Sequence, residues 1–336
     1  MSDMQMTRRH FAGIAAVGTA TLGASLVGCS NSTPAASQAA ASSAAEATAS
    51  SAEEAAASSN PAEETEKAMA RPVILVTSFG TSFPESRHIT IGAIESAIRE
   101  SFPDYDIRRA FTAQIIIDHI EEDTGRHIDN FEEAMDRAIA DGVPKIIVQP
   151  THLTDGAEFG DVSDSVDNYR SQGVDVVLGT PLLTTEKDHV DVCDALIQEF
   201  SPYEADDTAI ILVGHGNEAT PHSAYDKFQE TLNAAGKKSY FVCTVEQTPG
   251  FEEAVTFVKE GGYTKAVLRP LMVVAGDHAN NDMAGTGESE NGEVDPESLA
   301  GMLMAEGIEV TNVLEGLGQI NEIDDIYVEH VKASIG

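Results

Sequence analysis

Short apolar strands that alternate with amphipathic helical patterns constrain the fold of this chain more than any other feature. Residues 72–77 have the composition of a first strand, and residues 85–100 carry apolar side chains at helical spacing. The further predicted strands are residues 107–111, 145–149, 174–178, 209–213, 239–243 and 265–269. Continuous apolar runs separated by helices indicate parallel strands that are covered on both faces. The predicted fold class is α/β with right-handed crossovers.

The two halves of this pattern resemble each other in sequence. Residues 74–80, ILVTSFG, are similar to residues 210–216, IILVGHG. Residues 145–150, KIIVQP, are similar to residues 265–270, KAVLRP. This similarity indicates an internal duplication, although βαβ units also resemble one another by chance.

A duplication predicts two similar lobes, residues 71–200 and residues 201–336, each with a parallel sheet flanked by helices. Ligands of open α/β sheets bind outside the carboxyl ends of the strands, so the active-site cleft is expected between the lobes. The offset between the second pair of similar segments aligns residues 156–158 with residues 276–278. Each lobe should therefore present one polar side chain after an equivalent strand.

The first 28 residues are predicted to be a removable export signal. Residues 7–11, TRRHF, form a twin-arginine pattern, and the weakly apolar residues 12–27 follow it. Residues 26–29, LVGC, resemble a bacterial lipobox, in which Cys29 becomes the lipidated N-terminus. The alternative is an ordinary signal peptide with an incidental cysteine. The lipobox predicts an exported protein, anchored by lipid at the outer face of the cytoplasmic membrane or in the periplasm.

Residues 29–70 follow the cut and contain mostly Ala, Ser and Glu. Such a composition buries too little apolar surface to offset the entropy of ordering, so we expect a disordered tether behind the lipidated cysteine. The fold is therefore expected in residues 71–336, which suffice for one large domain or two lobes.

The formal charge of −36 restricts the partners of this chain. It argues against nucleic acid, whose phosphates are bound by lysine and arginine, and it favours accumulation of cations at the surface. Cys193 falls in a helical pattern and Cys243 in a strand, which favours buried thiols over a disulfide.

Two histidines follow predicted strands. His215 lies between two glycines, which remove bulk and allow the backbone to turn sharply. His278 follows the apolar run of residues 271–275. A turn histidine and a capped helix start are the alternatives. Glu158, at the position equivalent to His278, would supply a carboxylate from the other lobe.

Imidazole and carboxylate groups suit a divalent first-row metal ion, and imidazole also accepts protons near neutral pH. The histidines are 63 residues apart, which excludes a helical HExxH zinc site. Ligands on separate loops predict an open site. The predicted catalytic and metal-binding residues are His215, His278 and Glu158.

The other histidines receive less specific interpretations. His152 could line the cleft, and His222 could start a helix or contact the rim of the site, so both stay outside the predicted catalytic set. Four more are expected to be solvated on or beside exposed helices: His88, His119, His127 and His189.

Several motifs together carry a resemblance to a known family. They are VTSFGTS at residues 76–82, RAFT at 109–112, GAEF at 156–159, GHG at 214–216, VE at 245–246, PLMVVAGDHANNDMA at 270–284 and LEGLG at 314–318. Over nearly all of residues 72–331 the chain resembles the anaerobic sirohydrochlorin cobaltochelatases, which are class II chelatases related to ferrochelatase. The segment from Gly276 to Met283 is the most specific of these motifs.

The resemblance implies a two-lobed chelatase fold with a tetrapyrrole between the lobes. It places the two metal-site histidines at His215 and His278 and the active-site glutamate at Glu158. The implied reaction inserts a divalent metal, Co(II) by family default and otherwise Fe(II) or Ni(II), into sirohydrochlorin with loss of two protons. The metal is then a substrate, and no permanently bound cofactor is expected. Residues 286–293 depart from the family pattern, and the chain contains no tryptophan.

The expected partners are a tetrapyrrole and a divalent metal ion, with membrane contact only through the lipid and no nucleic acid. A homo-oligomer is compatible with the sequence. Because a tetrapyrrole of this kind carries many carboxylates, basic contacts must be local, and Arg109 is a candidate. The alternative function is a lipid-tethered binding protein for haem, another tetrapyrrole or metal that serves a transporter without catalysis.

Overall fold

The structure, a computed structural model, describes residues 70–216, 223–287 and 293–336. These residues belong to one compact unit. Among them, no helix combines the length and the apolar character needed to cross a membrane.

Several predictions fall on residues outside these ranges. They concern the export signal, Cys29, the tether up to residue 69, His222 and residues 288–292 of the loop that departs from the family pattern. The boundary predicted between residues 200 and 201 lies where the chain passes from the first sheet to the second, and it stays a prediction.

The first sheet has four parallel strands in the order β2-β1-β3-β4. They are β1 (Val73–Ser78), β2 (Asp106–Phe111), β3 (Ile146–Pro150) and β4 (Val176–Leu178). The helices of this half are α1 (Pro84–Ile89), α2 (Ile91–Ser101), α3 (Gln114–Thr124), α4 (Phe131–Ala140), α5 (Ala157–Ser171) and α6 (Glu186–Phe200). All six residues of β1 are buried, as expected for a strand that is covered on both faces.

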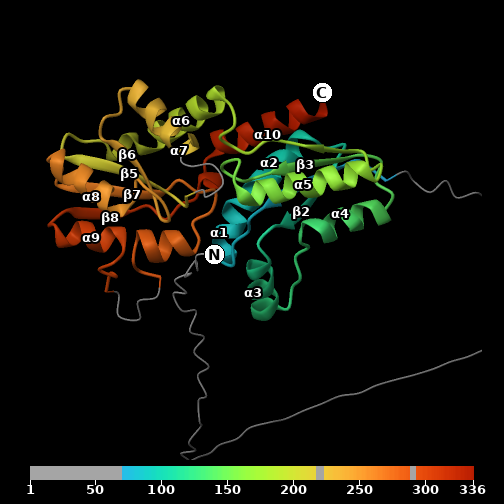
Figure 1. Cartoon of the computed structure of the whole chain (residues 1–336), viewed down its shortest axis with the longest axis horizontal. Helices are drawn as coiled ribbons and strands as arrows, with labels where there is room; N and C mark the ends of the chain where they lie inside the picture. The colour runs from blue at the N-terminus through green and yellow to red at the C-terminus, as the bar shows by residue number, and fades with distance from the viewer. Residues whose placement is uncertain (1–69, 217–222, 288–292) are drawn as a thin grey trace, which may run out of the picture. The chain divides into compact units, whose positions relative to one another are not determined.

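The second sheet repeats this arrangement in the order β6-β5-β7-β8, again with parallel strands. They are β5 (Thr208–Gly214), β6 (Tyr240–Thr244), β7 (Lys265–Pro270) and β8 (Glu309–Asn312). Its helices are α7 (Ser223–Ala234), α8 (Phe251–Glu260), a π-helix (Ala279–Met283), α9 (Leu299–Ala305) and α10 (Asn321–Ile335). The predicted α/β class and the two similar lobes are confirmed (Figure 1).

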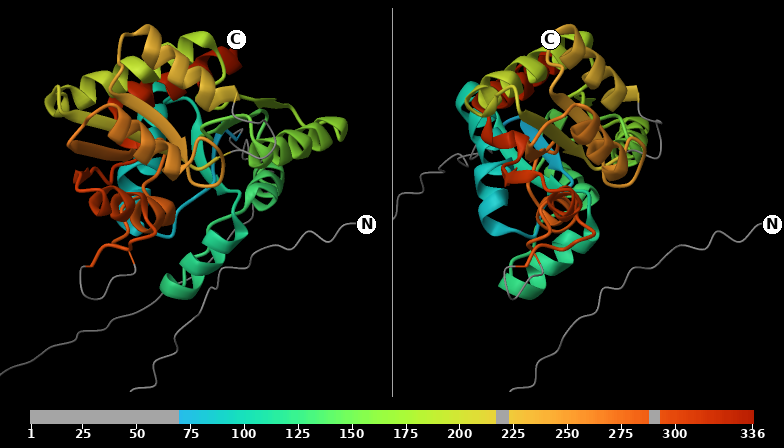
Figure 2. Two further views of the ribbon diagram at one scale, coloured as in Figure 1. Left: turned by 60° about the vertical axis from the view of Figure 1, so that its left-hand side comes forward. Right: turned by 90° about the vertical axis from the view of Figure 1, so that its left-hand side faces the viewer.

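Both sheets contribute one face to a shared apolar core. Side chains alternate across a strand, and Ile74 of β1 and Ile210 of β5 point into the same cluster, which also contains residues of α6 and α10. The opposite faces have separate clusters, with α4 and α5 on the first sheet and α8 and α9 on the second. Figure 2 shows α6, α7 and α10 grouped on one side of the sheets.

Helix α10 packs against elements of the first half although it ends the chain. It contacts α2, β3 and α6. The hydroxyl of Tyr327 donates a hydrogen bond to the carbonyl of Thr151, at 2.9 Å. His330 Nε2 lies 3.1 Å from Asp188 Oδ1 of α6, and both side chains are nearly buried. The last helix therefore joins the two lobes.

Backbone hydrogen bonds at the strand ends show how similar the two lobes are. The N–H of Ala113 donates to the carbonyl of Phe79 at 3.2 Å. In the second lobe the N–H of Glu246 donates to the carbonyl of His215 at 3.0 Å. The pairing of β1 with the edge strand β2 therefore continues beyond the strand ends in the same way as that of β5 with the edge strand β6, which makes Phe79 the counterpart of His215.

His189 corrects one expectation from the sequence. It was predicted to be solvated, but it is 3 % exposed and its ring lies near that of Phe228. Burial lowers the pKa of His189. The inner face of α6 includes this position together with Val192 and Leu196, which the helical spacing alone did not reveal. The predicted free, buried thiols of Cys193 and Cys243 are confirmed.

Candidate metal centre

His215 follows the last residue of β5, and the structure explains why the residues on both sides of it are glycines. A Cβ atom on Gly214 would stand 2.3 Å from the ring of Tyr225, so the strand end packs directly on this ring. Gly216 has a φ of 116°, which favours glycine. The Tyr225 hydroxyl accepts a long hydrogen bond of 3.5 Å from the Gly216 N–H. The backbone that carries His215 is therefore fixed on both sides.

Glu246 follows β6, the neighbour of β5 in the sheet. The N–H of Val245 donates to the carbonyl of Gly214, and that of Glu246 donates to the carbonyl of His215, both at 3.0 Å. These bonds continue the pairing of the two strands beyond their ends. They place Glu246 Oε1 3.8 Å from His215 Nε2.

His278 lies between β7 and the π-helix. His278 is the N-cap residue of the π-helix, as the alternative of a helix start predicts, but its ring makes no capping hydrogen bond. Its Nδ1 lies 2.9 Å from Asp282 Oδ2, and this hydrogen bond raises the pKa of His278. Because the carboxylate occupies Nδ1, the tautomer leaves Nε2 for a metal ion, as in carboxylate–histidine–metal arrangements. A π-helix at this point agrees with the frequent occurrence of such turns at functional sites.

The rings of His215 and His278 meet at an interplanar angle of 82°, with their centroids 4.6 Å apart. Potential ligand atoms of His215, Glu246 and His278 lie within 4.8 Å of one another. We call these three residues the metal cluster. Its side chains are between 34% and 46% exposed, so an ion held there remains accessible. Three ligands from three loops leave coordination positions open, which is typical of reactive sites rather than of structural ones.

Glu158, the third predicted residue, begins the first turn of α5 and is exposed. Among the described residues it does not belong to the metal cluster. Its charge nevertheless acts on the hydroxyl of Tyr225, whose pKa is raised chiefly by burial. Glu158 therefore comes from the first lobe and approaches the loop that carries His215. Its catalytic role stays a prediction.

His152 lies between β3 and Glu158, and the described residues offer no hydrogen-bond partner to either ring nitrogen. Burial lowers the pKa of His152 to about 4, and the charge of Glu158 opposes this shift. The ring is therefore neutral near pH 7. It therefore adds no positive charge beside Glu158.

Glu246 is the residue that the sequence did not identify as a ligand. Its signal is present, because Glu246 comes two residues after a strand, as a polar side chain at the carboxyl end. Identifying Glu246 as a ligand requires the order of the strands, because the pairing of β6 with β5 brings Glu246 beside His215. That pairing is not visible in one sequence.

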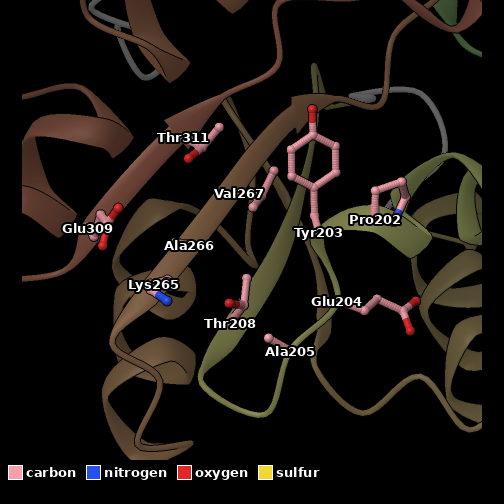
Figure 3. A pocket seen from close by; sticks show the side chains of 10 residues that line it. All are labelled: Pro202, Tyr203, Glu204, Ala205, Thr208, Lys265, Ala266, Val267, Glu309 and Thr311. Atoms are coloured by element: carbon pink, nitrogen blue, oxygen red, sulfur yellow. The ribbon is translucent and has the colours of Figure 1, made fainter.

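A cavity of about 230 Å3 lies at the other end of the second sheet. Figure 3 shows Thr208, Lys265 and Glu309, which begin β5, β7 and β8, around this cavity together with Tyr203. Lys265 is paired with Asp207 at 3.1 Å. Since ligands of open α/β sheets bind at the carboxyl ends of the strands, the metal cluster is the better candidate for the reaction site.

A second group of histidine and carboxylates lies on the loop between α3 and α4. His127 is within 2.9 Å of both Glu121 and Glu133, and Asp129 is close to it. Hydrogen bonds to these glutamates raise the pKa of His127. Arg137 pairs with Asp129, so a network of ion pairs accounts for this exposed group.

Comparison with known proteins agrees with the fold and identifies the family. The profile of the cobalt chelatase (CbiK) family matches residues 72–336. A sirohydrochlorin cobaltochelatase of Salmonella typhimurium is 31% identical over 265 residues, which cover 79% of this chain and 97% of the relative. The sirohydrochlorin cobaltochelatase CbiKC of Nitratidesulfovibrio vulgaris is 26% identical over 269 residues, or 80% of this chain and 92% of the relative.

The fold has counterparts among solved structures. The sirohydrochlorin chelatase SirB from Bacillus subtilis subspecies spizizenii, in complex with cobalt, superimposes with a TM-score of 0.52 at 13% identity. The aligned region covers 79% of this chain and 95% of SirB. SirB from Bacillus subtilis with Fe3+ gives a TM-score of 0.51 at 15% identity, with the same coverage. The family match over residues 72–336 decides the classification: this chain belongs to the cobalt chelatase (CbiK) family.

Proposed function

We propose that this protein inserts a divalent metal ion into a sirohydrochlorin-type tetrapyrrole and releases two protons. The observation that carries the proposal is the convergence of His215, Glu246 and His278 from three strand ends in a chain of the cobalt chelatase family. The names of the two relatives support sirohydrochlorin as the acceptor.

In this proposal the metal cluster presents the ion to the macrocycle. Two imidazole nitrogens and one carboxylate hold a divalent ion, and the open coordination positions accept pyrrole nitrogens as the ligands are exchanged. Asp282 orients the His278 ring through Nδ1, at 2.9 Å. The ion must leave again, so exposed ligands that bind it with moderate strength suit a substrate better than buried ones.

The two pyrrole protons require acceptors on the protein. Each metal–nitrogen bond that replaces an N–H bond releases one proton, so charge balances when the ion enters the ring. Glu158, on the other lobe, is proposed to accept a proton from the macrocycle as a general base. His215 is proposed to accept the other at the Nε2 that the departing ion frees.

We propose Co(II) as the physiological metal, because both curated relatives are named cobaltochelatases. Nitrogen and carboxylate donors also suit Fe(II), Ni(II) and Zn(II). The assay should therefore compare several ions under identical conditions.

We also propose that the protein is exported and anchored through a lipid on Cys29, at the outer face of the cytoplasmic membrane or in the periplasm. The twin-arginine pattern and the lipobox support this location. Chelation would then take place outside the cytoplasm.

Anaerobic metal insertion tests the proposed function. The purified full-length chain is mixed with sirohydrochlorin and Co(II), Fe(II) or Ni(II), and the absorbance change is followed. We expect His215→Ala to lower the insertion rate at least about a hundredfold, or about 2.7 kcal/mol of transition-state stabilisation. His127→Ala is the matched control, because it removes an imidazole that also lies among carboxylates.

Two results would contradict this function. One is a wild-type protein that gives no metal-dependent change above the uncatalysed rate. The other is equal rates for wild type and His215→Ala. Stoichiometric capture of intact haem or metal without insertion would instead identify a carrier.

A further inference from the structure

The metal cluster lies in acidic surroundings, which conflicts with an acidic substrate. The chain has 56 acidic and 20 basic residues, and Asp277, Glu246 and Asp282 lie at the cluster itself. A macrocycle with many carboxylates would be repelled there. If the proposed function is correct, a local cationic surface must bind these carboxylates.

Most arginines among the described residues cannot form this cationic surface, because carboxylates of the protein already neutralise them. Arg109, the candidate from the sequence, forms a double hydrogen bond with Glu95 at 2.5 and 2.8 Å. Arg108 and Arg137 are paired with aspartates. Within the part of the chain that the structure describes, the arginines without a carboxylate within 4.0 Å are Arg87, Arg99 and Arg126.

Arg87 and Arg126 differ from Arg99 because the charge of Arg126 acts on the guanidinium group of Arg87. Arg87 is half-buried on α1, and Arg126 is exposed just after α3. Burial lowers the pKa of Arg87, and the charges of Arg109 and Arg126 lower it further. Two neighbouring guanidinium groups that lack a counter-ion repel each other, and a bound anion would remove this cost.

The backbone contacts of Arg87 connect it to the metal cluster. Its Nη1 donates a 2.9 Å hydrogen bond to the carbonyl of Thr81. Thr81 is buried against Gly276, since its Oγ1 would lie 3.4 Å from a Cβ on that glycine. Gly276 precedes His278 by two residues. The guanidinium is therefore held beside the segment that carries the metal ligand.

Exposed apolar side chains stand next to this position. Phe79 and Phe83 flank Thr81 in sequence and are 44% and 38% exposed, and Ile115 of α3 is 50% exposed. A tetrapyrrole is a flat ring with apolar faces and carboxylates at its rim. Its faces match the exposed apolar side chains, and its carboxylates match the guanidinium groups beside them.

We propose that Arg87 and Arg126 form a binding subsite for the carboxylate side chains of the tetrapyrrole and select macrocycles that carry many of them. The inference rests on the proposed function and names residues that determine specificity. Arg87 offers a fixed fork, because one of its nitrogens is already anchored at Thr81. Arg126 adds a second cation on the loop that follows α3.

Titration of metal-free porphyrins tests the subsite. An octacarboxylate and a dicarboxylate porphyrin are titrated into the full-length protein, wild type and Arg87→Met or Arg126→Met, by absorbance. We expect each substitution to raise the Kd of the octacarboxylate about tenfold, the loss of one charge-assisted contact. The Kd of the dicarboxylate should change less, and added salt should weaken binding less in the variants.

Arg99→Met is the matched control, because Arg99 on α2 also lacks a carboxylate partner but is not among the charges that act on Arg87. Arg87→Lys retains the charge without the fork and should fall between wild type and Arg87→Met. Unfolding midpoints verify that each variant is folded. In the insertion assay the effect should fall on the KM of the macrocycle rather than on kcat.

The subsite is wrong if both arginine variants bind the octacarboxylate as Arg99→Met does while wild type inserts metal. Inorganic phosphate is titrated as a competitor, and a loss confined to phosphate affinity would also overturn the macrocycle assignment. Failure of the wild-type protein to insert metal, while the arginine variants still bind the octacarboxylate more weakly than Arg99→Met does, would refute the proposed function and leave the subsite intact.

Discussion

The three ligands of the metal cluster have counterparts in the first lobe that are chemically different. Phe79 is the counterpart of His215, and Ala113 is that of Glu246, because each pair is joined by an equivalent backbone hydrogen bond. Glu158 is the counterpart of His278 in the aligned segments. Of the three first-lobe positions, only Glu158 carries a side chain that can accept a proton. In the proposed reaction one lobe thus presents ligands, and the other presents a base.

This division predicts different effects for two conservative substitutions. Glu246→Gln should raise the Kd for Co(II) about tenfold or more, measured by competition with a metal-sensitive dye in the absence of macrocycle, because it removes a charged ligand. Glu158→Gln should leave that Kd within about twofold and lower kcat by about a hundredfold, because it removes a general base. Equal shifts of metal affinity in both variants would place Glu158 among the ligands.

At the residue scale, the sequence identifies side chains at strand ends but not their neighbours across the sheet. His215 and His278 are recognisable because each ends an apolar run. Glu246 needs the strand order, and Arg109 points to Glu95 of α2, which no local pattern reveals. The prediction that His189 is solvated is wrong, because the apolar spacing of α6 does not show which of its sides packs against another helix.

At the scale of elements, α10 has an unusual composition for a helix between lobes. Six of its fifteen residues are buried, and one of them is Asp324. This carboxyl group is 5 % exposed, and its Oδ1 has no hydrogen-bond partner among the described residues. Burial, with a smaller effect of Asp325, raises the pKa of Asp324 to about 8. The folded protein therefore favours the neutral, protonated form of the Asp324 carboxyl group.

Asp324 should make stability fall as pH rises. The pKa is about 8 in the folded protein and about 3.9 in the unfolded chain, so the contribution is complete below pH ~4 and is lost as the pH rises through ~8. Asp324→Asn should remove this decline and stabilise the protein at pH 9 by about 2 kcal/mol or more, in urea unfolding. The exposed Asp325→Asn is the control. An unchanged pH profile for Asp324→Asn would show that the carboxylate is solvated.

At the scale of the whole molecule, the sequence predicts the lobes well but not their union. The strands are recognisable because buried parallel strands are continuously apolar. The core that the two sheets share is not recognisable in this way. The local sequences around Ile74 and Ile210 show that each residue is buried, but not that both belong to one cluster. That α10 returns to the first lobe follows only from contacts such as Tyr327 with Thr151.

The match to the chelatase family begins at residue 72, so the proposed anchor at Cys29 lies outside the matching part of the chain. Cys29→Ser in the full-length chain should move the protein from the membrane fraction to the soluble fraction after cell lysis. Metal insertion by the variant should stay within about twofold of wild type, because the match to the chelatase family starts at residue 72. Wild-type protein that is already soluble and carries no lipid by mass spectrometry would contradict the anchor.

The N–H of Glu246 donates to the carbonyl of His215 and that of Ala113 to the carbonyl of Phe79, so the two lobes contain similar loops with chemically unequal side chains. A planar acceptor between such copies would receive its ion from one side and lose protons toward the other. Incoming cations and outgoing protons would then follow separate routes and would not compete for the same side chains. The unequal side chains of two similar loops would thus give the proposed reaction a direction.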